Sequence, residues 1–287
     1  MFSVRSAADP ETVVAVPCML RRIVKLGISL AVDLGDRLPR AVRGGGPVGS
    51  CGVVLYYHAV PEAQGAAFAR QMERLRSWAQ PWALEGPVPS AARWVGISFD
   101  DAYESVWDNA VPVLQRLGIP FTVFVPTGSL GLRPGWVHSD RHLFRHEKVM
   151  TPERICELAA LPHVTLGSHT VSHPRLTRLS PAEAERELKD SKRTLEDLTG
   201  RPVDLLSFPH GDWNAQMVDL AWVAGYRRLF GIEPVRLEAT TLPLVVGRVA
   251  VAPGDTILEF ILKLKGCYRW AVHLHARRWA ALQSASL

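Results

Sequence analysis

The sequence predicts an α/β fold in which short parallel strands alternate with helices in one barrel-like domain. Apolar runs and helical patterns follow one another repeatedly, which is the order that parallel strands with crossover helices produce. The chain has 287 residues, and barrels of about 250 residues are commonly single domains. Its composition, 47% hydrophobic and 21% charged, is sufficient for a full core.

The predicted strands are short apolar runs at 53–57, 94–99, 121–125, 164–166, 204–208, 227–231 and 244–251. Helical patterns lie between them at 68–80, 105–117, 152–160, 181–199 and 215–224. The helix over 181–199 is the best defined, because Ser180 and Glu183 form a capping box before it and Gly200 is a typical residue to end it.

The two ends of the chain differ from its middle in charge. Residues 19–43 carry six Lys/Arg against two Asp, and residues 260–287 carry five Lys/Arg and no acidic residue, although the whole chain has a formal charge of only +5. Gly44-Gly45-Gly46-Pro47 is typical of a linker. We therefore expect a basic amphipathic helix and linker over 1–50, the barrel over 51–255, and a basic helical tail over 256–287.

The helix predicted near the N-terminus has an apolar stripe with basic residues outside it. The stripe consists of Leu20, Ile23, Val24, Gly27, Leu30, Ala31, Leu34 and Leu38, and the basic residues are Arg21, Arg22, Lys25 and Arg37. Such a helix can lie in a membrane interface, and it can equally pack on the barrel. Both outcomes remain open at this point.

Several functional classes find no support in the sequence. Lys25 and Asp33 bracket the apolar stretch 28–32 too tightly for a secretory signal or a membrane span, so we expect a cytoplasmic enzyme or one peripheral on the inner membrane. The four cysteines show no metal or redox spacing. The pI is near 9.2, but the basic residues sit at the ends without a recognition motif, so we expect no nucleic-acid partner.

Two motifs far apart in the chain together predict a metal site. His169 and His173 lie four residues apart in Leu-Gly-Ser-His-Thr-Val-Ser-His-Pro, and the pair Asp100-Asp101 follows the apolar run near 94–99. A hydrolytic zinc site uses three protein ligands and leaves a position open, and imidazole and carboxylate are suitable ligands. We expect Asp101, His169 and His173 to hold one divalent ion, Zn²⁺ by preference, with Co²⁺, Ni²⁺ or Mn²⁺ as other candidates.

The second aspartate supplies a different function. A bound metal lowers the pKa of water to roughly 7, and a carboxylate outside the ligand set can then act as general base. We assign that role to Asp100. Consecutive strand residues point to opposite faces, so both aspartates can serve one site only where the strand ends. Taken singly, each motif has another interpretation: an Asp-Asp turn or helix cap, or an incidental histidine pair on a loop before Pro174.

Three segments, in order, resemble the first three motifs of the polysaccharide deacetylases, also called the NodB-homology or carbohydrate esterase 4 family. They are Ser-Phe-Asp-Asp-Ala at 98–102, Ser-His-Thr-Val-Ser-His-Pro-Arg-Leu-Thr at 168–177 and Ser-Phe-Pro-His-Gly-Asp-Trp-Asn at 207–214. The resemblance covers about residues 52–252. It implies a distorted, TIM-like (β/α)7-type barrel that removes N-acetyl groups from amino sugars, with Asp100 as base and Asp101, His169 and His173 as metal ligands.

The resemblance also assigns a role to the third motif. It implies that Phe208, Pro209 and Gly211 wall the substrate groove and that the backbone N–H of His210 holds the developing oxyanion. A donor of this kind typically contributes about 3–4 kcal/mol to lowering the barrier. On its residues alone, Phe-Pro-His-Gly is equally an ordinary turn.

Two departures from the family pattern concern other catalytic groups. Many members carry an arginine two residues before the motif-three proline, where this chain has Ser207. We expect Arg248 to replace it and to line the substrate site, with a structural salt bridge as the other interpretation. No late histidine matches the family's general acid, but 53–58 resembles the opening strand of the exopolysaccharide subgroup and ends in His58. His58 is therefore our candidate general acid or substrate contact, unless it only packs in the barrel rim.

The sequence thus predicts a metal-dependent hydrolase that removes N-acetyl groups from amino sugars of a polysaccharide, oligosaccharide or lipid-linked glycan. Two alternatives remain. The same site could remove formyl from a lipid-linked aminosugar, or the barrel could bind carbohydrate without turnover.

Overall fold

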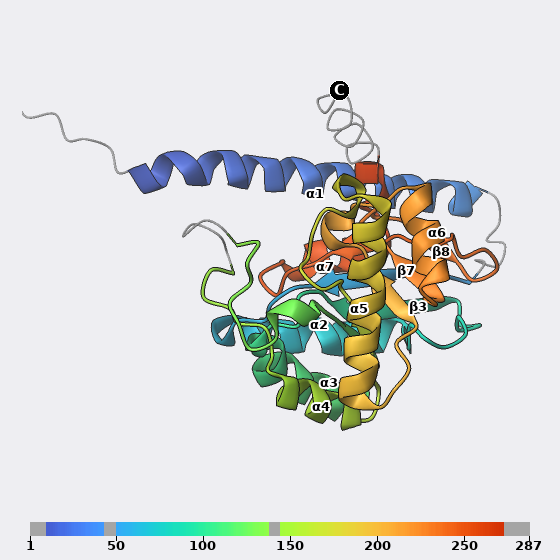
Figure 1. The fold of residues 1–287 in the computed structure, drawn as a ribbon. Helices are drawn as coiled ribbons and strands as arrows, with labels where there is room; N and C mark the ends of the chain where they lie inside the picture. Colours follow the sequence, from blue (N-terminus) through green and yellow to red (C-terminus); the bar gives the residue numbers. More distant parts are fainter. Residues whose placement is uncertain (1–9, 43–49, 138–143, 273–287) are drawn as a thin grey trace, which may run out of the picture. The chain divides into compact units, whose positions relative to one another are not determined.

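The computed structural model describes residues 10–42, 50–137 and 144–272. It divides the chain into two compact units, Met1–Pro47 and Val48–Leu287. The first unit contains the long helix α1 (Pro10–Val42), which includes the amphipathic helix predicted from the sequence (Figure 1). The predicted linker at 44–47 and the end of the predicted tail, 273–287, lie outside the described residues. None of the described helices is long and apolar enough to cross a membrane.

The second unit is built on a sheet of mainly parallel strands. Its path runs β10-β1-β3-β4-β5-β6-β7-β9, and every neighbouring pair along it is parallel. These strands are β1 (Cys51–Tyr57), β3 (Arg93–Phe99), β4 (Phe121–Val125), β5 (Val164–Ser168), β6 (Leu205–Ser207), β7 (Arg228–Phe230), β9 (Val245–Val246) and β10 (Val249–Ala250). Two short strands lie off the path: β2 (Gln80–Trp82) beside β3, and β8 (Leu237–Glu238), antiparallel to β1.

One short segment closes the sheet into a barrel. β9 pairs with β7 at one end of the path and β10 pairs with β1 at the other, while only Gly247 and Arg248 separate them. The single strand predicted over 244–251 is therefore broken in two. Space is tight at the break, because a Cβ on Gly247 would lie 2.3 Å from the carbonyl oxygen of Glu233. The predicted distorted (β/α) barrel is confirmed.

The helices of the second unit are α2 (Gly65–Trp78), α3 (Val111–Leu117), α4 (Pro152–Ala160), α5 (Pro181–Thr199), α6 (Ala215–Val223) and α7 (Ile257–Leu264) (Figure 1). A π-helical turn, Val106–Ala110, precedes α3. Turns of 3₁₀ helix occur at Glu62–Gln64, Thr127–Ser129, Leu176–Arg178, Pro209–Gly211 and Arg269–Ala271. The helix predicted over 68–80 was wrong at its end. Helix α2 ends at Trp78, and Gln80 already belongs to strand β2, which includes Pro81.

Capping residues fix the beginnings of the two best-defined helices. Ser180 and Glu183 form the predicted capping box of α5, and Gly200 ends that helix in a left-handed conformation. Thr256 and Glu259 form a second capping box at the start of α7. Helix α7 buries Phe260 and contacts β1 and α2, so this helix packs within the same unit as the barrel.

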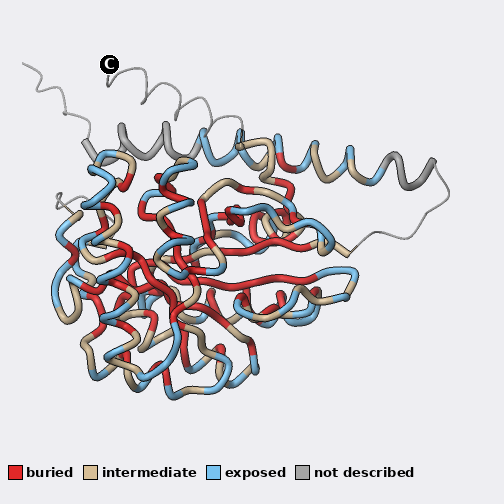
Figure 2. Tube along the Cα trace, turned by 45° about the vertical axis from the view of Figure 1, so that its right-hand side comes forward, coloured by how far each residue is buried: buried red, intermediate tan, exposed pale blue. Residues whose placement is uncertain are grey.

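The strands alternate between two hydrophobic clusters. In β1, Val53, Leu55 and Tyr57 belong to the larger cluster, which also includes the buried faces of the helices, while Val54 belongs to the smaller one. The smaller cluster also holds Trp94, Phe124, Phe230 and five further residues, most of them from the strands, and fills the inside of the barrel. Figure 2 shows the burial along the chain: most strand residues are buried, and most exposed residues lie on the helices and loops. Side chains two residues apart in a strand therefore share the interior, which decides the geometry of the functional site.

We predict that Gly167→Ala lowers the free energy of unfolding by about 1–3 kcal/mol through overpacking. Gly167 lies in β5, and a Cβ there would be 2.4 Å from the Phe124 ring and 3.1 Å from the Leu205 carbonyl oxygen. Gly65→Ala is the matched control, since Gly65 begins α2 in helical geometry with nothing within 4 Å of the added carbon. It should be neutral or slightly stabilising. Urea titrations that give equal values for both variants would contradict the packing described.

Candidate metal centre and active site

The candidate site lies where the parallel strands end, which is the functional end of a barrel of this kind. Strand β3 ends directly before Asp100, β5 ends before His169, and β1 ends before His58. The third motif follows β6, and Arg248 occupies the break between β9 and β10. Segments far apart in the sequence therefore meet at one rim.

The predicted metal ligands come together. In the part of the chain that the structure describes, Asp101, His169 and His173 form the one group whose carboxylate oxygen and imidazole nitrogens all lie within 4.8 Å of one another. Oδ1 of Asp101 is 3.7 Å from Nε2 of His169 and 3.5 Å from Nε2 of His173. Two ligand atoms that are each roughly 2.1 Å from a tetrahedral ion lie about 3.4 Å from each other. The spacing fits one ion.

The polar atoms of this group also fit a metal. Oδ1 of Asp101 is buried and makes no hydrogen bond, although it faces both imidazoles. Nδ1 of His169 lies 2.8 Å from the carbonyl oxygen of Ser207, so it is the ring nitrogen that carries hydrogen and leaves Nε2 with a free lone pair. A buried carboxylate oxygen without a partner is costly, and a cation between these atoms would remove that cost.

Left-handed backbone conformations turn the ligands toward each other. Of six non-glycine residues with positive φ in the described chain, five are Asp101, Ala102, Thr170, His173 and His210. Such conformations are unfavourable for residues with a Cβ, and they accumulate at functional sites where the surrounding structure enforces them. In β3 the alternation places Asp100 on the interior face, and the left-handed turn brings Asp101 to the same site. His173 itself lies in a loop, directly before Pro174.

Asp100 is held by Arg248 and stands outside the ligand group. The guanidinium of Arg248 donates from Nη1 and Nη2 to the two carboxylate oxygens of Asp100, at 2.7 and 2.8 Å. It also donates to the hydroxyls of Ser98 and Ser207 and, through Nε, to the carbonyl oxygen of Gly231. Arg248 has no exposed surface, so it cannot bind substrate directly. Its guanidinium lies beside Ser207, the position that many members of the family fill with an arginine.

The two neighbouring carboxyls have opposite electrostatic environments. Burial alone would raise the pKa of Asp100. The charge of Arg248, and to a smaller extent that of His169, outweighs burial, so the pKa of Asp100 lies below its usual value. Burial and the charge of Asp100 raise the pKa of Asp101 to about 8. Burial lowers the pKa of His169 to about 4 and also lowers that of His173. Without an ion, the site therefore holds one ionised carboxylate, Asp100, beside neutral imidazoles.

The third motif forms a tight turn at the rim. Pro209 has no N–H. The amide of Gly211 donates to the carbonyl oxygen of Phe208, and the amide of Asp212 donates to that of Pro209. The backbone donor of the turn that lies between Pro209 and Gly211 is the amide of His210. The imidazole of His210 lies 4.5 Å from that of His173, centroid to centroid. Gly211 has φ +65°, and a Cβ there would meet Ile232 at 2.3 Å.

Phe208 does not form the groove wall that was predicted. Its side chain is fully buried and belongs to the cluster between the sheet and the helices. Alternation explains this, because Ser207 points into the barrel and the next residue must point outward. Pro209 is buried as well. These two residues shape the turn, and they offer a ligand no exposed side chain.

His58 directly follows β1, at the same end of the sheet as Asp100 and His169. Its ring stacks on Phe144 at 5.3 Å and meets the edge of Tyr56 at 5.5 Å. It is partly exposed, and it is close enough to influence the pKa of Asp100, His169 and His173. His58 therefore contributes to the electrostatic surroundings of Asp100 and the two histidines.

Three contributors were not identified from the sequence. The ring of Trp136 stacks on His173 at 4.1 Å, so it covers a predicted metal ligand. Glu187 of α5 accepts hydrogen bonds from the amides of Val171 and Ser172 and thereby holds the loop between the two histidines. Asp212 accepts from the amide of Thr177 and ties the second motif to the third. Only Asp212, which lies within the third motif, had a local signal.

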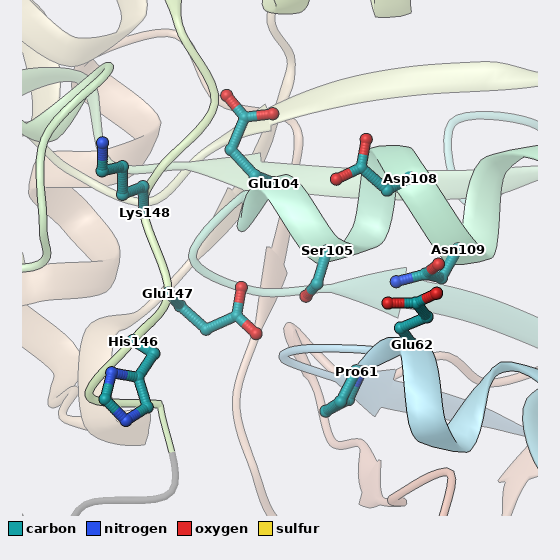
Figure 3. A pocket seen from close by; sticks show the side chains of 9 residues that line it. All are labelled: Pro61, Glu62, Glu104, Ser105, Asp108, Asn109, His146, Glu147 and Lys148. Carbon is teal, nitrogen blue, oxygen red and sulfur yellow. The ribbon is translucent and has the colours of Figure 1, made fainter.

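A separate polar cavity of about 620 Å³ lies beside the segments that follow His58 and Asp101 (Figure 3). Its lining consists of Pro61, Glu62, Glu104, Ser105, Asp108, Asn109, His146, Glu147 and Lys148. Burial raises the pKa of Glu147 there. None of the three predicted metal ligands lines it, so it is distinct from the metal centre.

Comparisons with known proteins agree with this geometry. Residues 88–229 match the model of a family described as polysaccharide deacetylase. That range contains Asp100, Asp101, His169 and His173, whereas His58 and Arg248 lie outside it.

Two curated relatives and one solved structure are similar to the chain. YxkH of Bacillus subtilis, named as a polysaccharide deacetylase, is 28% identical over 158 residues, which is 55% of this chain and 51% of that protein. The poly-beta-1,6-N-acetyl-D-glucosamine N-deacetylase of Staphylococcus aureus is 23% identical over 179 residues, 62% of this chain and 60% of that protein. The match thus spans only about half to 60% of these relatives.

The solved structure supports the fold. The deacetylase PplD of Streptococcus pyogenes, in complex with acetate, superposes with a TM-score of 0.62 at 21% identity, covering 75% of this chain and 98% of that one. The match of residues 88–229, just under half of the chain, and the named relatives lead to one conclusion: this region is similar to the polysaccharide deacetylase family.

Proposed function

We propose that the protein is a metal-dependent hydrolase that removes N-acetyl groups from amino sugars of a polysaccharide, oligosaccharide or lipid-linked glycan. The observation that carries this proposal is the pairing of two groups at one rim. Asp101, His169 and His173 can hold an ion, and Asp100 stays ionised and outside that group. Hydrolysis of an amide needs both an electrophilic centre and a base.

The ion we propose is Zn²⁺, with Co²⁺, Ni²⁺ or Mn²⁺ able to use the same ligands. Two imidazoles and one carboxylate are the composition of known catalytic zinc sites. When bound, the ion supplies Lewis acidity that activates water and polarises the acyl oxygen. The chain's part is to fix the ligands, and it fixes the two histidines through Ser207 at His169, Glu187 at the histidine loop and Trp136 at His173.

Asp100 acts as the general base. It accepts a proton from the attacking water, and Arg248 keeps the carboxylate ionised and fixes the direction of both oxygens. The guanidinium thus performs the task of the arginine that Ser207 replaces. The presence of Arg248 beside Asp100 therefore favours an active enzyme over a barrel without turnover.

Two further groups complete the reaction. The backbone N–H of His210 donates to the oxygen that becomes negative when water attacks the acetamide carbon. When the carbon–nitrogen bond breaks, the leaving amine takes a proton, and we assign its donation to His58, which lies at the same end of the sheet as Asp100. The products are acetate and a free amino sugar, and the proton lost by water resides on Asp100.

We predict that Asp100→Asn lowers acetate release by about 10²–10⁴-fold while zinc affinity changes little, because the residue acts as base and is not a ligand. Asp101→Asn, its matched control, should lose zinc affinity as well. The assay uses chitooligosaccharides, β-1,6-linked N-acetylglucosamine oligomers and lipid-linked N-acetyl sugars. Release of formate and not acetate would indicate the deformylase, and zinc binding without release from any acylated sugar would indicate a binding barrel.

We predict that Arg248→Met shifts the acid limb of the kcat/KM–pH profile to higher pH. Arg248 lowers the pKa of Asp100 against the effect of burial, so without the cation the pKa rises and the base stays protonated to higher pH. Ser207→Ala removes one hydrogen bond but keeps the ion pair, and should shift the limb much less. If both variants give the same profile as the wild type, the ion pair does not govern the base.

We predict that zinc affinity falls with pH below about 8. The carboxyl of Asp101 has a pKa raised to about 8 in the metal-free protein, and the ion binds the ionised form. Each unit below that value should therefore weaken binding about tenfold, with release of one proton. His169 adds no dependence there, because its pKa is lowered to about 4. Competition with a chelator between pH 6 and 8 measures the slope, and a flat line would show that Asp101 is not a ligand.

A further inference from the structure

Helix α1 has one face that is entirely apolar. At 100° per residue, the nine residues of this face between positions 20 and 35 fall in a single arc of about 160°. They are Leu20, Ile23, Val24, Gly27, Ile28, Leu30, Ala31, Leu34 and Gly35, and we call this set the α1 apolar face. Every charged residue between 20 and 37 lies in the other half of the helix.

The α1 apolar face is exposed. All nine of its residues are exposed, and the side chains of Leu20, Ile23 and Leu34 have 60%, 57% and 59% of their surface in contact with solvent. Contiguous exposed apolar surface of this kind marks an interaction site. The residues concerned belong to the first unit and take no part in the barrel core.

The charges beside this face indicate what covers it. Arg21 and Arg37 are the first residues beyond its two edges, and Lys25 follows on the side of Arg21. The acidic residues Asp33 and Asp36 lie farther round, on the opposite half, and Arg37 donates to the carboxylate of Asp33 at 2.6 Å, so Arg21 and Lys25 are the stronger lipid contacts. Residues 19–43 together carry six basic residues against two acidic ones. A helix that is apolar on one face and basic at its margins is complementary to anionic lipid head groups above an acyl layer.

We propose that α1 docks on an anionic membrane surface, lying in the interface with the α1 apolar face against the acyl chains and Arg21, Lys25 and Arg37 among the phosphates. A second copy of the chain fits less well, because the margins of the face carry arginine on both sides and helices paired through such faces need opposite charges there. The docking is independent of the hydrolytic reaction and would bring the protein to a lipid surface whatever the glycan.

The test is co-sedimentation of the full chain with vesicles of phosphatidylcholine alone and of phosphatidylcholine with phosphatidylglycerol at 7:3. We expect binding to the anionic vesicles at least about tenfold tighter than to the neutral ones, and weakened by salt. The triple variant Leu20→Ser, Ile23→Ser, Leu34→Ser should lose about tenfold or more. The variant Arg21→Gln, Lys25→Gln, Arg37→Gln should lose about tenfold on anionic vesicles and little on neutral ones.

A matched control removes equal apolar surface from the second unit. Leu132, Val223 and Leu244 are exposed by 59%, 70% and 60%, and their triple replacement by serine should leave vesicle binding unchanged. Circular dichroism and zinc affinity confirm that each variant is folded. The proposal is overturned if the wild type does not sediment, if the α1 serine variant binds as the wild type does, or if binding ignores lipid charge. A dimer that the α1 serine variant abolishes, without vesicle binding, would assign the face to a second copy.

Discussion

The ion pair between Arg248 and Asp100 is the interaction on which the rest of the site depends. Arg248 lies in the two-residue break where one segment closes the barrel, and Asp100 ends the strand beside the opening strand. Both charged groups are buried, so each requires the other, and the hydroxyls of Ser98 and Ser207 and the carbonyl oxygen of Gly231 accept the remaining hydrogen bonds of the guanidinium. The same pair that neutralises two buried charges also keeps a carboxylate ionised next to the metal ligands. Closure of the fold and preparation of the base are thus one arrangement.

Two kinds of backbone geometry assemble the site. Strand alternation directs Ser98, Asp100, Ser207 and Arg248 into the barrel, where they bond to one another. Left-handed residues then turn the chain beyond the strand ends, so that Asp101 and His173 meet His169. The first mechanism makes the base and its support, and the second makes the metal ligands. This division explains why adjacent aspartates can have pKa values displaced in opposite directions.

Much of this could be predicted from the sequence, where the signal was local. Helices α4 and α5 and strand β4 have the predicted bounds, since capping residues and apolar runs define them. The ligand group followed from residue chemistry and from the order of strands. The outward direction of Phe208 could have been found by counting alternation from the strand, but the contact of Arg248 with Asp100 spans 148 residues and has no local pattern. The break at Gly247 depends on the close approach of the Glu233 backbone, which is distant in sequence. Strand β2 could not be predicted because it has only three residues and one of them is a proline.

The central claim is that Asp101, His169 and His173 hold one divalent ion while Asp100 remains outside its coordination, paired with Arg248. A crystal structure of the zinc-loaded protein, with anomalous diffraction measured at the zinc absorption edge, tests it most directly. The account predicts a single strong peak about 2.0–2.2 Å from Oδ1 of Asp101 and from Nε2 of both histidines, with Asp100 still bonded to Arg248. A peak elsewhere, or one coordinated by Asp100, would contradict it.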